Sequence, residues 1–304
     1  MRDTGIVIVT YNSGAEIGEC LDAALAACDS VIVIDNASED DTTDVVRSRN
    51  VRLIANSMNR GFAAAVNQGV HAIEKDFILL LNPDAVLKTG IGPLRAVLDQ
   101  PNAAGSCGKL IGVDGRTQAG FAVRRLPTPA ALAFEALLVN RLWRTNPVNW
   151  HYRCLDVNLD LPGWVEQPAG ALFMFRRDVW SRLGGFDESF FPLWFEDVDF
   201  CQRAANLGYR MYYTPSVVAR HTGGHSIQRV SLEKREICWY GNLLGYAYKH
   251  FPLAGARVVS LTVFAGSILR MIMGIVIQRS LKPITVYGAV MRLAGRRMLA
   301  GPSR

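Results

Sequence analysis

Short apolar runs alternate with helix-length stretches over the first hundred residues of the chain. The apolar runs are residues 6–9, 31–34, 51–55 and 77–81, and the stretches near 15–27, 39–48 and 62–74 are rich in alanine and amphipathic. A run of four or five apolar residues is typical of a strand that is buried on both faces. Strand and helix alternating at this spacing predict right-handed crossovers and a mostly parallel sheet in an α/β fold.

Polar side chains follow each predicted strand. They form four clusters: Thr10-Tyr11-Asn12-Ser13, Asp35-Asn36-Ala37-Ser38, Asn59-Arg60-Gly61-Phe62 and Asn82-Pro83-Asp84. Because ligands of open α/β sheets bind outside the carboxyl ends of the strands, we expect these clusters to converge on one site. Each cluster also has a purely structural interpretation, as a helix cap, a capping box or a turn.

The usual nucleotide-binding loops are absent from the sequence. No G-x-G-x-x-G follows the first strand and no G-x-x-x-x-G-K-[ST] occurs anywhere, so the sequence does not indicate a dinucleotide dehydrogenase or a P-loop NTPase. A metal ion could still hold a diphosphate. Mg²⁺ binds through one or two carboxylates together with substrate phosphates, which makes Asp84, at the end of a predicted strand, a candidate ligand.

A second group of candidate residues lies between positions 170 and 206. Apolar residues recur at intervals of three and four from 198 to 205, which predicts a short helix that begins near Glu196 and ends before Gly208. Glu196 and Asp197 then lie in its first turn, where acidic residues also stabilise a helix through its macrodipole. Trp194 and Phe195 precede them, and a carboxylate among aromatic rings loses hydration and becomes a better proton acceptor.

His221 follows two short strand-like runs at 209–213 and 217–219. His225 stands four residues further on, as in a zinc-binding helix, but Gly223 and Gly224 between them favour a loop. His221 could therefore be a metal ligand just past a strand end. A histidine in such a place is more often a hydrogen-bonded surface residue.

Basic charge is concentrated at the C-terminus. The whole chain carries +6, and its last 68 residues hold nine cationic and no acidic side chains, which leaves −3 for the first 236 residues. This distribution, without a nucleic-acid-binding motif, does not favour a nucleic-acid partner. Residues 258–277 are apolar and just long enough to cross a bilayer, but Arg270 near their centre would cost about 2.5 to 3.5 kcal/mol.

We therefore favour helices that lie on an anionic membrane surface, with a membrane span or an ordinary core or oligomer helix as the alternatives. The six cysteines are scattered without a C-x-x-C pair, and the N-terminus lacks the pattern of a secretory signal. These two features predict reduced thiols and a cytoplasmic location. Together with the surface-lying helices, they predict a peripheral position on the inner face of the plasma membrane.

Seven segments, in order between residues 6 and 226, together resemble the family 2 glycosyltransferases of the GT-A fold, in particular their bacterial rhamnosyltransferase-like branch. The segments are IVIVTYNS, VIVIDNAS, NRGFAAAVNQG, LLLNPDA, GALFMFRRDVWSRLGGFDESFF, WFEDVDFCQRAANLGY and VVARHTGGHS. The resemblance implies a mostly parallel nucleotide-binding sheet flanked by helices in residues 1–230, with a nucleotide-sugar half at 1–105 and an acceptor and catalytic half at 106–230. Residues 231–304 would form a helical, membrane-associating extension.

The resemblance also assigns roles to residues. The catalytic base would be Asp197, with Glu196 beside it, and the metal ligands for Mg²⁺ or Mn²⁺ would be Asp84 and His221. Asn82 stands where the family has the first acid of its metal motif, which puts coordination by two carboxylates in doubt. The nucleotide-sugar site would comprise Thr10, Tyr11, Asn12, Asp35, Asn36, Asn59, Gly61, Phe62, Asn67, Asn82 and Asp84. The acceptor and sugar pocket would comprise Gly170, Ala171, Trp194 and Phe195.

The activity implied is an inverting, metal-dependent transfer of a sugar, with rhamnose from dTDP-rhamnose as the preferred donor. The acceptor would be a hydroxyl of a glycan or of a polyprenyl-diphosphate-linked saccharide in cell-surface polysaccharide synthesis. Two alternatives stay open: a membrane-docked nucleotide-sugar-binding protein without transfer activity, and a sugar nucleotidyltransferase. The sequence leaves the oligomeric state open.

Overall fold

The computed structural model describes residues 2–223 and 231–300, and His225, the second histidine of the predicted loop, lies outside them. The chain folds into two compact units, one of residues 1–125 and 153–226 and the other of residues 126–152 and 227–304. Residues 126–152, which belong to the predicted catalytic half, thus group with the C-terminal residues. The division into domains at 1–230 and 231–304 stays a prediction.

The first unit begins with the predicted alternation of strands and helices, which is confirmed. Its elements are β1 (Thr4–Thr10), α1 (Gly14–Ala27), β2 (Val31–Asp35), α2 (Thr42–Arg47), β3 (Arg52–Ala55), α3 (Phe62–Ala72) and β4 (Phe77–Leu81). The remaining elements are β5 (Ala85–Leu87), α4 (Gly92–Val97), β6 (Ala103–Ile111), β7 (Val123–Arg124), β8 (Gly163–Val165), β9 (Gln167–Pro168), β10 (Leu172–Arg176), α8 (Arg177–Leu183), α9 (Glu196–Asn206) and β11 (Arg210–His221).

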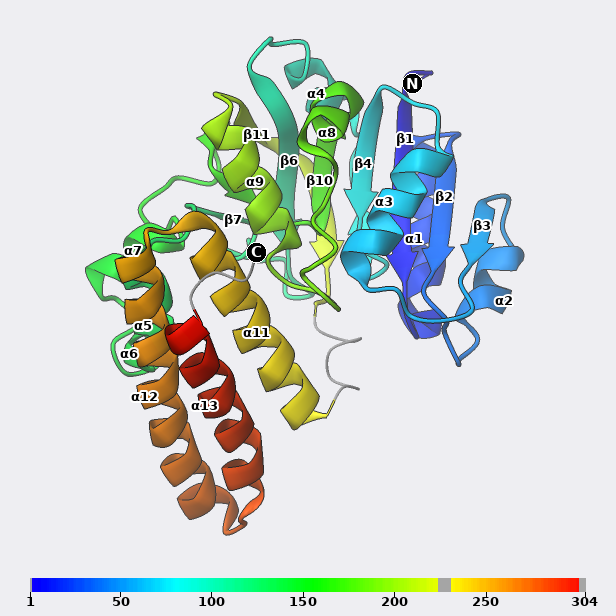
Figure 1. The fold of residues 1–304 in the computed structure, drawn as a ribbon. Helices are drawn as coiled ribbons and strands as arrows, with labels where there is room; N and C mark the ends of the chain where they lie inside the picture. The colour runs from blue at the N-terminus through cyan, green and yellow to red at the C-terminus, as the bar shows by residue number, and fades with distance from the viewer. Residues whose placement is uncertain (1, 224–230, 301–304) are drawn as a thin grey trace. The chain divides into compact units, whose positions relative to one another are not determined.

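A nine-stranded mixed sheet forms the centre of this unit. Its order is β3-β2-β1-β4-β10-β6-β11-β5, and β8 pairs with β11. β1 to β4 are parallel neighbours, whereas β10 is antiparallel to both β4 and β6. β6 and β11 are parallel, so the carboxyl ends of β1, β2, β3, β4, β6 and β11 share one edge of the sheet (Figure 1).

Side chains alternate between two apolar layers on the faces of the sheet. Ile6, Ile8, Leu79 and Leu81 point toward α1 and α4 and are buried with them. Neighbouring residues in the sequence point to the other face, where Val7 and Ile34 contact Gly69 of α3. On that same face Phe173 and Phe175 of β10 contact aromatic rings of α8 and α9. The sheet is thus covered on both sides, which explains why its strands are apolar throughout.

The structure corrects one predicted element. Apart from Tyr209, the runs 209–213 and 217–219 are parts of the single strand β11, whose pairing with β6 shifts register between Thr214 and Val218. The shift places Pro215 and Ser216 outside the paired residues, which is why the sequence pattern looks interrupted there. His221 is the last residue of β11 rather than the first residue after a strand.

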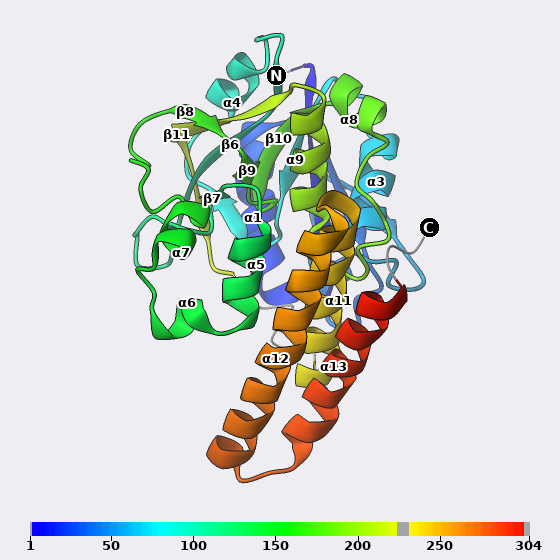
Figure 2. The ribbon, with the colours of Figure 1, turned by 60° about the vertical axis from the view of Figure 1, so that its left-hand side comes forward.

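The second unit is helical. Its short helices are α5 (Pro129–Ala136), α6 (Val139–Leu142) and α7 (Pro147–Tyr152), and its long helices are α11 (Leu232–His250), α12 (Leu253–Gln278) and α13 (Lys282–Ala300). α12 and α13 pack as an antiparallel hairpin (Figure 2). Arg270 of α12 donates hydrogen bonds to the backbone oxygens of Glu135 and Ala136 at the carboxyl end of α5. A cation in this position also interacts favourably with the α5 dipole.

Candidate active site

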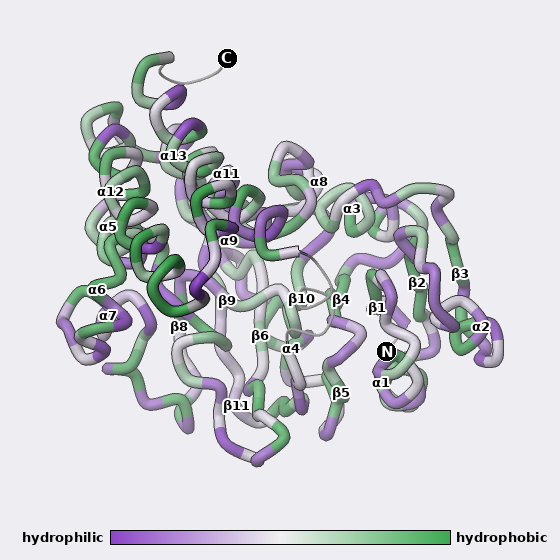
Figure 3. Tube along the Cα trace, turned by 90° about the horizontal axis from the view of Figure 1, so that it is seen from below, coloured by the Kyte–Doolittle hydropathy of each residue, from purple (hydrophilic) through white to green (hydrophobic). Residues whose placement is uncertain are grey.

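Strand register brings the predicted site residues to one edge of the sheet. Thr10 pairs with Asp35 across β1 and β2, and Leu81 pairs with Leu172 across β4 and β10. Beyond that last pair, the backbone N–H of Asn82 donates to the oxygen of Ala171 at 3.1 Å. In Figure 1 the arrows of β2, β3 and β4 point downward. Figure 3 shows the molecule from below, so the ends of these strands face the reader and lie side by side.

Strained backbone marks the same edge. Asn12, Ala37, Trp194 and Phe195 have φ values of 52°, 66°, 78° and 75°, which L-residues rarely adopt. Trp194 and Phe195 are consecutive, and they lead directly into α9, where Glu196 and Asp197 stand. Conformations of this kind cost of the order of 1–3 kcal/mol each and cluster at functional sites.

The most buried candidates hold the loops of the edge in place. Asp35 is 1% exposed and accepts hydrogen bonds from the Thr10 hydroxyl at 2.8 Å and from the backbone N–H of Ser38 at 3.0 Å. The Ser38 hydroxyl also donates to Asp35 and accepts from the backbone N–H of Asn12. Asp35 therefore connects the loops that follow β1 and β2.

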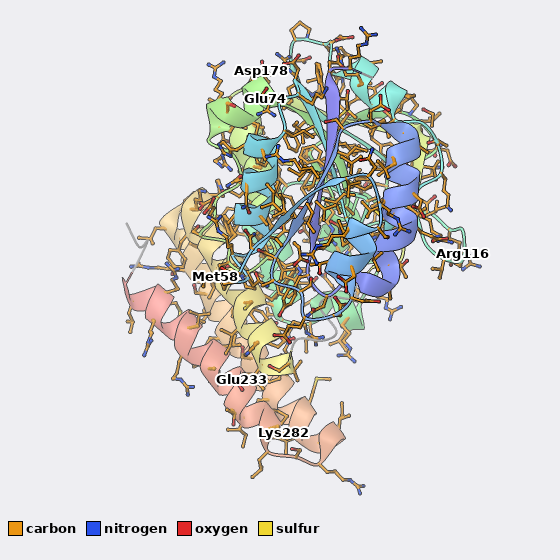
Figure 4. All side chains as sticks on the ribbon, turned by 90° about the vertical axis from the view of Figure 1, so that its right-hand side faces the viewer. Met58, Glu74, Arg116, Asp178, Glu233 and Lys282 are labelled. Carbon is orange, nitrogen blue, oxygen red and sulfur yellow. The ribbon has the colours of Figure 1, made fainter. Side chains whose placement is uncertain are left out.

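Asn36 organises the loop that follows β3. Its side-chain nitrogen donates to the side-chain oxygen of Asn59 and the backbone oxygen of Gly61, and its side-chain oxygen accepts from the Arg60 N–H and from Asn56. The amide of Asn36 is thus fully used inside the protein. Figure 4 labels Met58 in this same loop, where its side chain is largely exposed.

Helix α3 joins this edge to the loop before α9. The Phe62 N–H donates to the oxygen of Pro192, and a Cβ on Gly61 would lie 2.8 Å from the ring of Phe191. Asn67 bonds both backbone groups of Phe186, at 2.9 Å each. The amide of Asn67 is therefore engaged with this loop, and its contact with a nucleotide stays a prediction.

The candidate residues differ in exposure. Thr10, Asp35, Asn36, Gly61 and Asn67 are buried, as are Ala171, Phe195, Glu196 and His221. The candidates with intermediate exposure are Tyr11, Asn12, Asn59, Phe62, Asn82, Asp84, Gly170, Trp194 and Asp197.

Asp84 and His221 meet where β5 pairs with the end of β11. Ala85 pairs with His221, which places one oxygen of Asp84 3.4 Å from the Nε2 atom of His221. The other oxygen of Asp84 accepts from the Gly223 N–H at 2.9 Å. Burial raises the pKa of Asp84, but the hydrogen bond and charge of His221 and the Gly223 N–H outweigh it, so the pKa lies below the usual 3.8.

This pair fits a divalent cation. Ligands about 2.1 Å from an octahedral ion lie about 3 Å apart when adjacent, close to the 3.4 Å between the Asp84 oxygen and Nε2. Within residues 2–223 and 231–300 no cluster of three or more histidine, cysteine or acidic residues is arranged to hold a metal. Two protein ligands leave the remaining positions to water and substrate oxygens, which is the usual arrangement for Mg²⁺.

The carboxylates of α9 stand at the same edge. One oxygen of the half-exposed Asp197 accepts from the Gly170 N–H at 3.2 Å, and the other accepts from the Val198 N–H at 2.8 Å. Burial raises the pKa of Asp197 above 3.8. Burial and the neighbouring charge of Asp197 raise the pKa of Glu196 well above 4.5. A carboxylate with a raised pKa that keeps some exposure is suited to general-base catalysis.

The third acid of the helix has a structural role. Asp199 is fully buried and forms an ion pair with Arg203 at 2.7 Å. Arg203 also donates to the backbone oxygens of Leu183 and Gly185, which fixes α9 against the end of α8.

Sequence reasoning missed the segment between β6 and β7. Gln118 and Phe121 both contact His221, the glutamine through hydrogen bonds and the phenylalanine by ring stacking. Arg124 lies 6.0 Å from the Phe121 ring centroid, and its charge offsets part of the rise that burial causes in the pKa of Asp197. The one signal in the sequence was a set of polar residues and a phenylalanine in a loop, which is too common to single out.

A hollow lies at the opposite end of the sheet from the candidate site. It has a volume of about 570 Å³, and its lining includes Phe77 at the start of β4, Arg176 and Asp178. Figure 4 labels Asp178 far from Met58. Arg176 and Asp178 pair with each other at 2.5 Å, so these charges neutralise one another.

Comparison with known proteins places the chain in a family. The sequence model described as Glycosyl transferase family 2 matches residues 5–183. An N-acetylglucosaminyl-diphospho-decaprenol L-rhamnosyltransferase of Mycobacterium tuberculosis is 30% identical over 246 residues, which cover 74% of this chain and 77% of the relative. Rhamnosyltransferase WbbL of Escherichia coli is 25% identical over 170 residues, which cover 55% of this chain and 60% of the relative.

Solved structures share the fold at lower identity. The mannosyltransferase PcManGT of Pyrobaculum calidifontis, in complex with GDP-Man and Mn²⁺, matches with a TM-score of 0.54 and 18% identity over 98% of this chain and 87% of that chain. TarS of S. aureus, residues 1–349 in complex with UDP-GlcNAc, matches with a TM-score of 0.55 and 18% identity over 98% of this chain and 83% of that chain. The predicted fold, an α/β sheet of GT-A type with C-terminal helices, is confirmed. The chain belongs to glycosyl transferase family 2 and resembles its rhamnosyltransferases.

Proposed function

We propose that the protein is an inverting, metal-dependent glycosyltransferase whose base is Asp197 and whose metal ligands are Asp84 and His221. The observation that carries the proposal is the strand register. It sets an Asp84 oxygen 3.4 Å from His221 Nε2, at the same edge of the sheet as Asp197, a residue of intermediate exposure.

The proposed reaction forms one bond and breaks one bond at the anomeric carbon of the donor sugar. The acceptor hydroxyl oxygen attacks this carbon while the bond to the diphosphate oxygen breaks, and the hydroxyl proton passes to a carboxylate oxygen of Asp197. Mg²⁺ or Mn²⁺, when bound, neutralises charge on the departing diphosphate. Asp84 and His221 would hold the ion, and Asn82 beside them would bind ribose or water.

Nucleotide recognition would fall to the half-exposed side chains at the ends of β1 and β3, which include Tyr11, Asn12, Asn59 and Phe62. In this proposal the buried Thr10, Asp35, Asn36, Gly61 and Asn67 act by shaping the loops that carry them. Gly170, Ala171, Trp194 and Phe195 would border the sugar and the acceptor beside Asp197.

The relatives guide the choice of substrates. The mycobacterial relative is named for rhamnosyl transfer to an N-acetylglucosaminyl-diphospho-decaprenol, and the relative in E. coli is also a rhamnosyltransferase. We therefore propose dTDP-rhamnose as donor and a polyprenyl-diphosphate-linked saccharide as acceptor, in the synthesis of a cell-surface polysaccharide.

A donor screen tests this function. The purified chain is incubated with Mn²⁺ and, in turn, dTDP-rhamnose, UDP-glucose, UDP-galactofuranose and UDP-N-acetylglucosamine, and mass spectrometry follows release of the nucleoside diphosphate and glycosylation of a lipid-linked acceptor. Release from dTDP-rhamnose that Asp197→Asn abolishes supports the proposal. Binding of every donor without turnover would instead support a nucleotide-sugar-binding protein.

We also propose that α12 places the protein on the inner face of the plasma membrane. In the described part of the chain, Leu253–Ile277 is long and apolar enough to cross a bilayer, and Figure 3 colours much of α12 as hydrophobic. Five apolar side chains along one face of α12 are about half exposed or more: Val258, Leu261, Leu269, Ile272 and Val276. This stripe, about 27 Å long at 1.5 Å per residue, carries no charge, because Arg270 points to α5 instead.

Cations accompany the stripe. Lys282 lies exposed at the turn between α12 and α13 (Figure 4), and Arg257 and Arg279 are also exposed. Apolar side chains beside exposed cations suit an interface of anionic lipids, to which each cation contributes about 1 kcal/mol.

A sedimentation experiment tests the membrane proposal with the full chain. Wild-type protein should sediment with phosphatidylglycerol-containing liposomes at low salt, and the double variant Leu261→Ser, Ile272→Ser should stay in the supernatant. Leu299→Ser, which changes an exposed apolar residue outside the stripe, is the matched control and should still sediment. Equal sedimentation of all three proteins would contradict the proposal.

A further inference from the structure

We propose that residues 141–144, Arg-Leu-Trp-Arg, form a second contact with an anionic lipid surface. Leu142 and Trp143 enter the interface between headgroups and acyl chains, and the two arginines bind headgroups. The inference rests on the proposed membrane position of the protein, and it adds a surface that is separate from the stripe on α12.

The segment exposes a leucine and a tryptophan in succession. Leu142, the last residue of α6, is 85% exposed, and Trp143 is 56% exposed. A single exposed apolar side chain is common on soluble proteins. Two consecutive ones with an exposed arginine on either side have the composition of a segment that lies in a membrane interface.

The two arginines have no acidic partner. Residues 136–152 contain no aspartate or glutamate, and Arg141 and Arg144 are both exposed. In the part of the chain that the structure describes, neither guanidinium forms an ion pair, whereas Arg49 and Arg176 of the first unit each pair with an aspartate. The segment thus presents two free positive charges, which are complementary to anionic headgroups.

Buried asparagines hold the segment from inside. Asn146 is fully buried and donates to the side-chain oxygen of Asn140 at 3.0 Å and to the backbone oxygen of Trp143 at 2.6 Å. Its own side-chain oxygen accepts from the N–H of Asn149 at 2.8 Å. Asn149, 5% exposed, donates to the backbone oxygen of Arg144 at 2.7 Å. These bonds fix the backbone of the segment while its apolar side chains stay in solvent.

A lipid surface fits this combination better than a second copy of the chain. The indole ring of a tryptophan suits the headgroup level of a bilayer, and cations beside it meet anionic lipids. A symmetric contact between two copies would instead bring the same segment against itself, so that arginine would face arginine.

The segment lies apart from the exposed stripe of α12 within the same unit. α5 contacts both α12 and α6, and Figures 2 and 3 show α6 and α12 on different sides of α5. With residues 141–144 as a second contact, the helical unit would meet the membrane at two places.

Vesicle binding tests the proposal with the full chain. Vesicles of phosphatidylcholine, alone or with phosphatidylglycerol, are titrated at low salt, and sedimentation gives the bound fraction. We expect Leu142→Ser and Trp143→Ser each to bind about tenfold more weakly than the wild type, because each loses an apolar side chain that the lipid buries. Leu299→Ser, which changes a leucine of the same unit that is 89% exposed, is the matched control and should bind as the wild type does.

Replacing the arginines separates charge from apolar contact. The double variant Arg141→Gln, Arg144→Gln should bind phosphatidylglycerol-containing vesicles more weakly by about fivefold for each cation removed. Its binding to vesicles of phosphatidylcholine alone should equal that of the wild type. An unchanged affinity for the anionic vesicles would contradict the role of the two arginines.

Fluorescence quenching locates Trp143 directly. Bromine atoms on the acyl chains quench a tryptophan that lies among them, so vesicles of brominated lipid should quench the bound wild type more than bound Trp143→Phe, which keeps an aromatic ring for binding. Equal quenching of the two proteins would show that Trp143 stays outside the lipid.

The results separate this inference from the proposed membrane position. A wild-type protein that binds no vesicles would overturn the membrane position itself. Wild-type binding that Leu142→Ser and Trp143→Ser leave unchanged would overturn only the contact at residues 141–144. Self-association of the wild type without lipid that Leu142→Ser abolishes would also overturn it, because the partner would then be a second copy of the chain.

Discussion

Replacing Asn67 by alanine should lower the free energy of unfolding of the first unit. Asn67 is 8% exposed and joins α3 to the loop before α9 through bonds of 2.9 Å to the backbone N–H and to the backbone oxygen of Phe186, which is 1% exposed. A third bond, to Glu188, lies at the exposed end of the loop. Each buried bond contributes about 1 kcal/mol, and a buried partner left unpaired costs about 1–3 kcal/mol. We expect a loss of about 2–4 kcal/mol.

Urea unfolding followed by tryptophan fluorescence measures this loss. Gln68→Ala is the control on the same helix. Among the residues that the structure describes, its amide bonds Asn56, which is half-exposed, so water can replace it and we expect a loss of under about 1 kcal/mol. Because the same loop leads into Asp197, turnover of Asn67→Ala should also fall. An unfolding free energy within about 0.5 kcal/mol of the wild type would refute the view that Asn67 joins the two parts of the site.

Three further outcomes follow from the contacts. Asp197→Asn should keep its affinity for dTDP while turnover falls about 10²- to 10⁴-fold, and retained turnover in a pure preparation would exclude Asp197 as the base. Asp197 must be deprotonated to act as the base, and burial raises its pKa, so kcat/KM should fall on the acid side with a midpoint above pH 3.8. A kcat/KM that stays constant down to pH 3.8 would contradict this. Arg270→Met should lower the free energy of unfolding of the second unit, measured in urea, by about 2–4 kcal/mol, because two backbone oxygens of α5 lose a charged donor. An unfolding free energy equal to that of the wild type would show that these bonds contribute nothing.

The first half of the fold could be predicted because its order follows from local patterns. The apolar runs and amphipathic stretches up to residue 81 correspond to β1 to β4 and α1 to α3 within a few residues. The insertion of β10 between β4 and β6 could not be predicted, since an apolar run does not specify which strands it pairs with. The pairing of β5 with β11, which brings Asp84 to His221, depends on that same long-range topology.

Residue types indicated the location of the candidate site better than they indicated the task of each residue. Asp35 and Asn36 stand at the predicted edge, yet their polar atoms bond neighbouring loops, because a buried polar group must find partners within the protein. Arg270 looked only like an obstacle to a membrane span until its hydrogen bonds to α5 were known. Such distinctions depend on three-dimensional contacts between residues far apart in the chain, as do the bonds of Gln118 to His221.

Calorimetric titration of the wild-type protein with dTDP, with and without Mn²⁺, tests the central claim most directly, because Asp84 and His221 are proposed to hold a diphosphate only through an ion. We predict binding that requires the metal in the wild type and loses this requirement, together with most of the affinity, in Asp84→Asn. Equal affinity for dTDP in the wild type with and without Mn²⁺ would contradict the account.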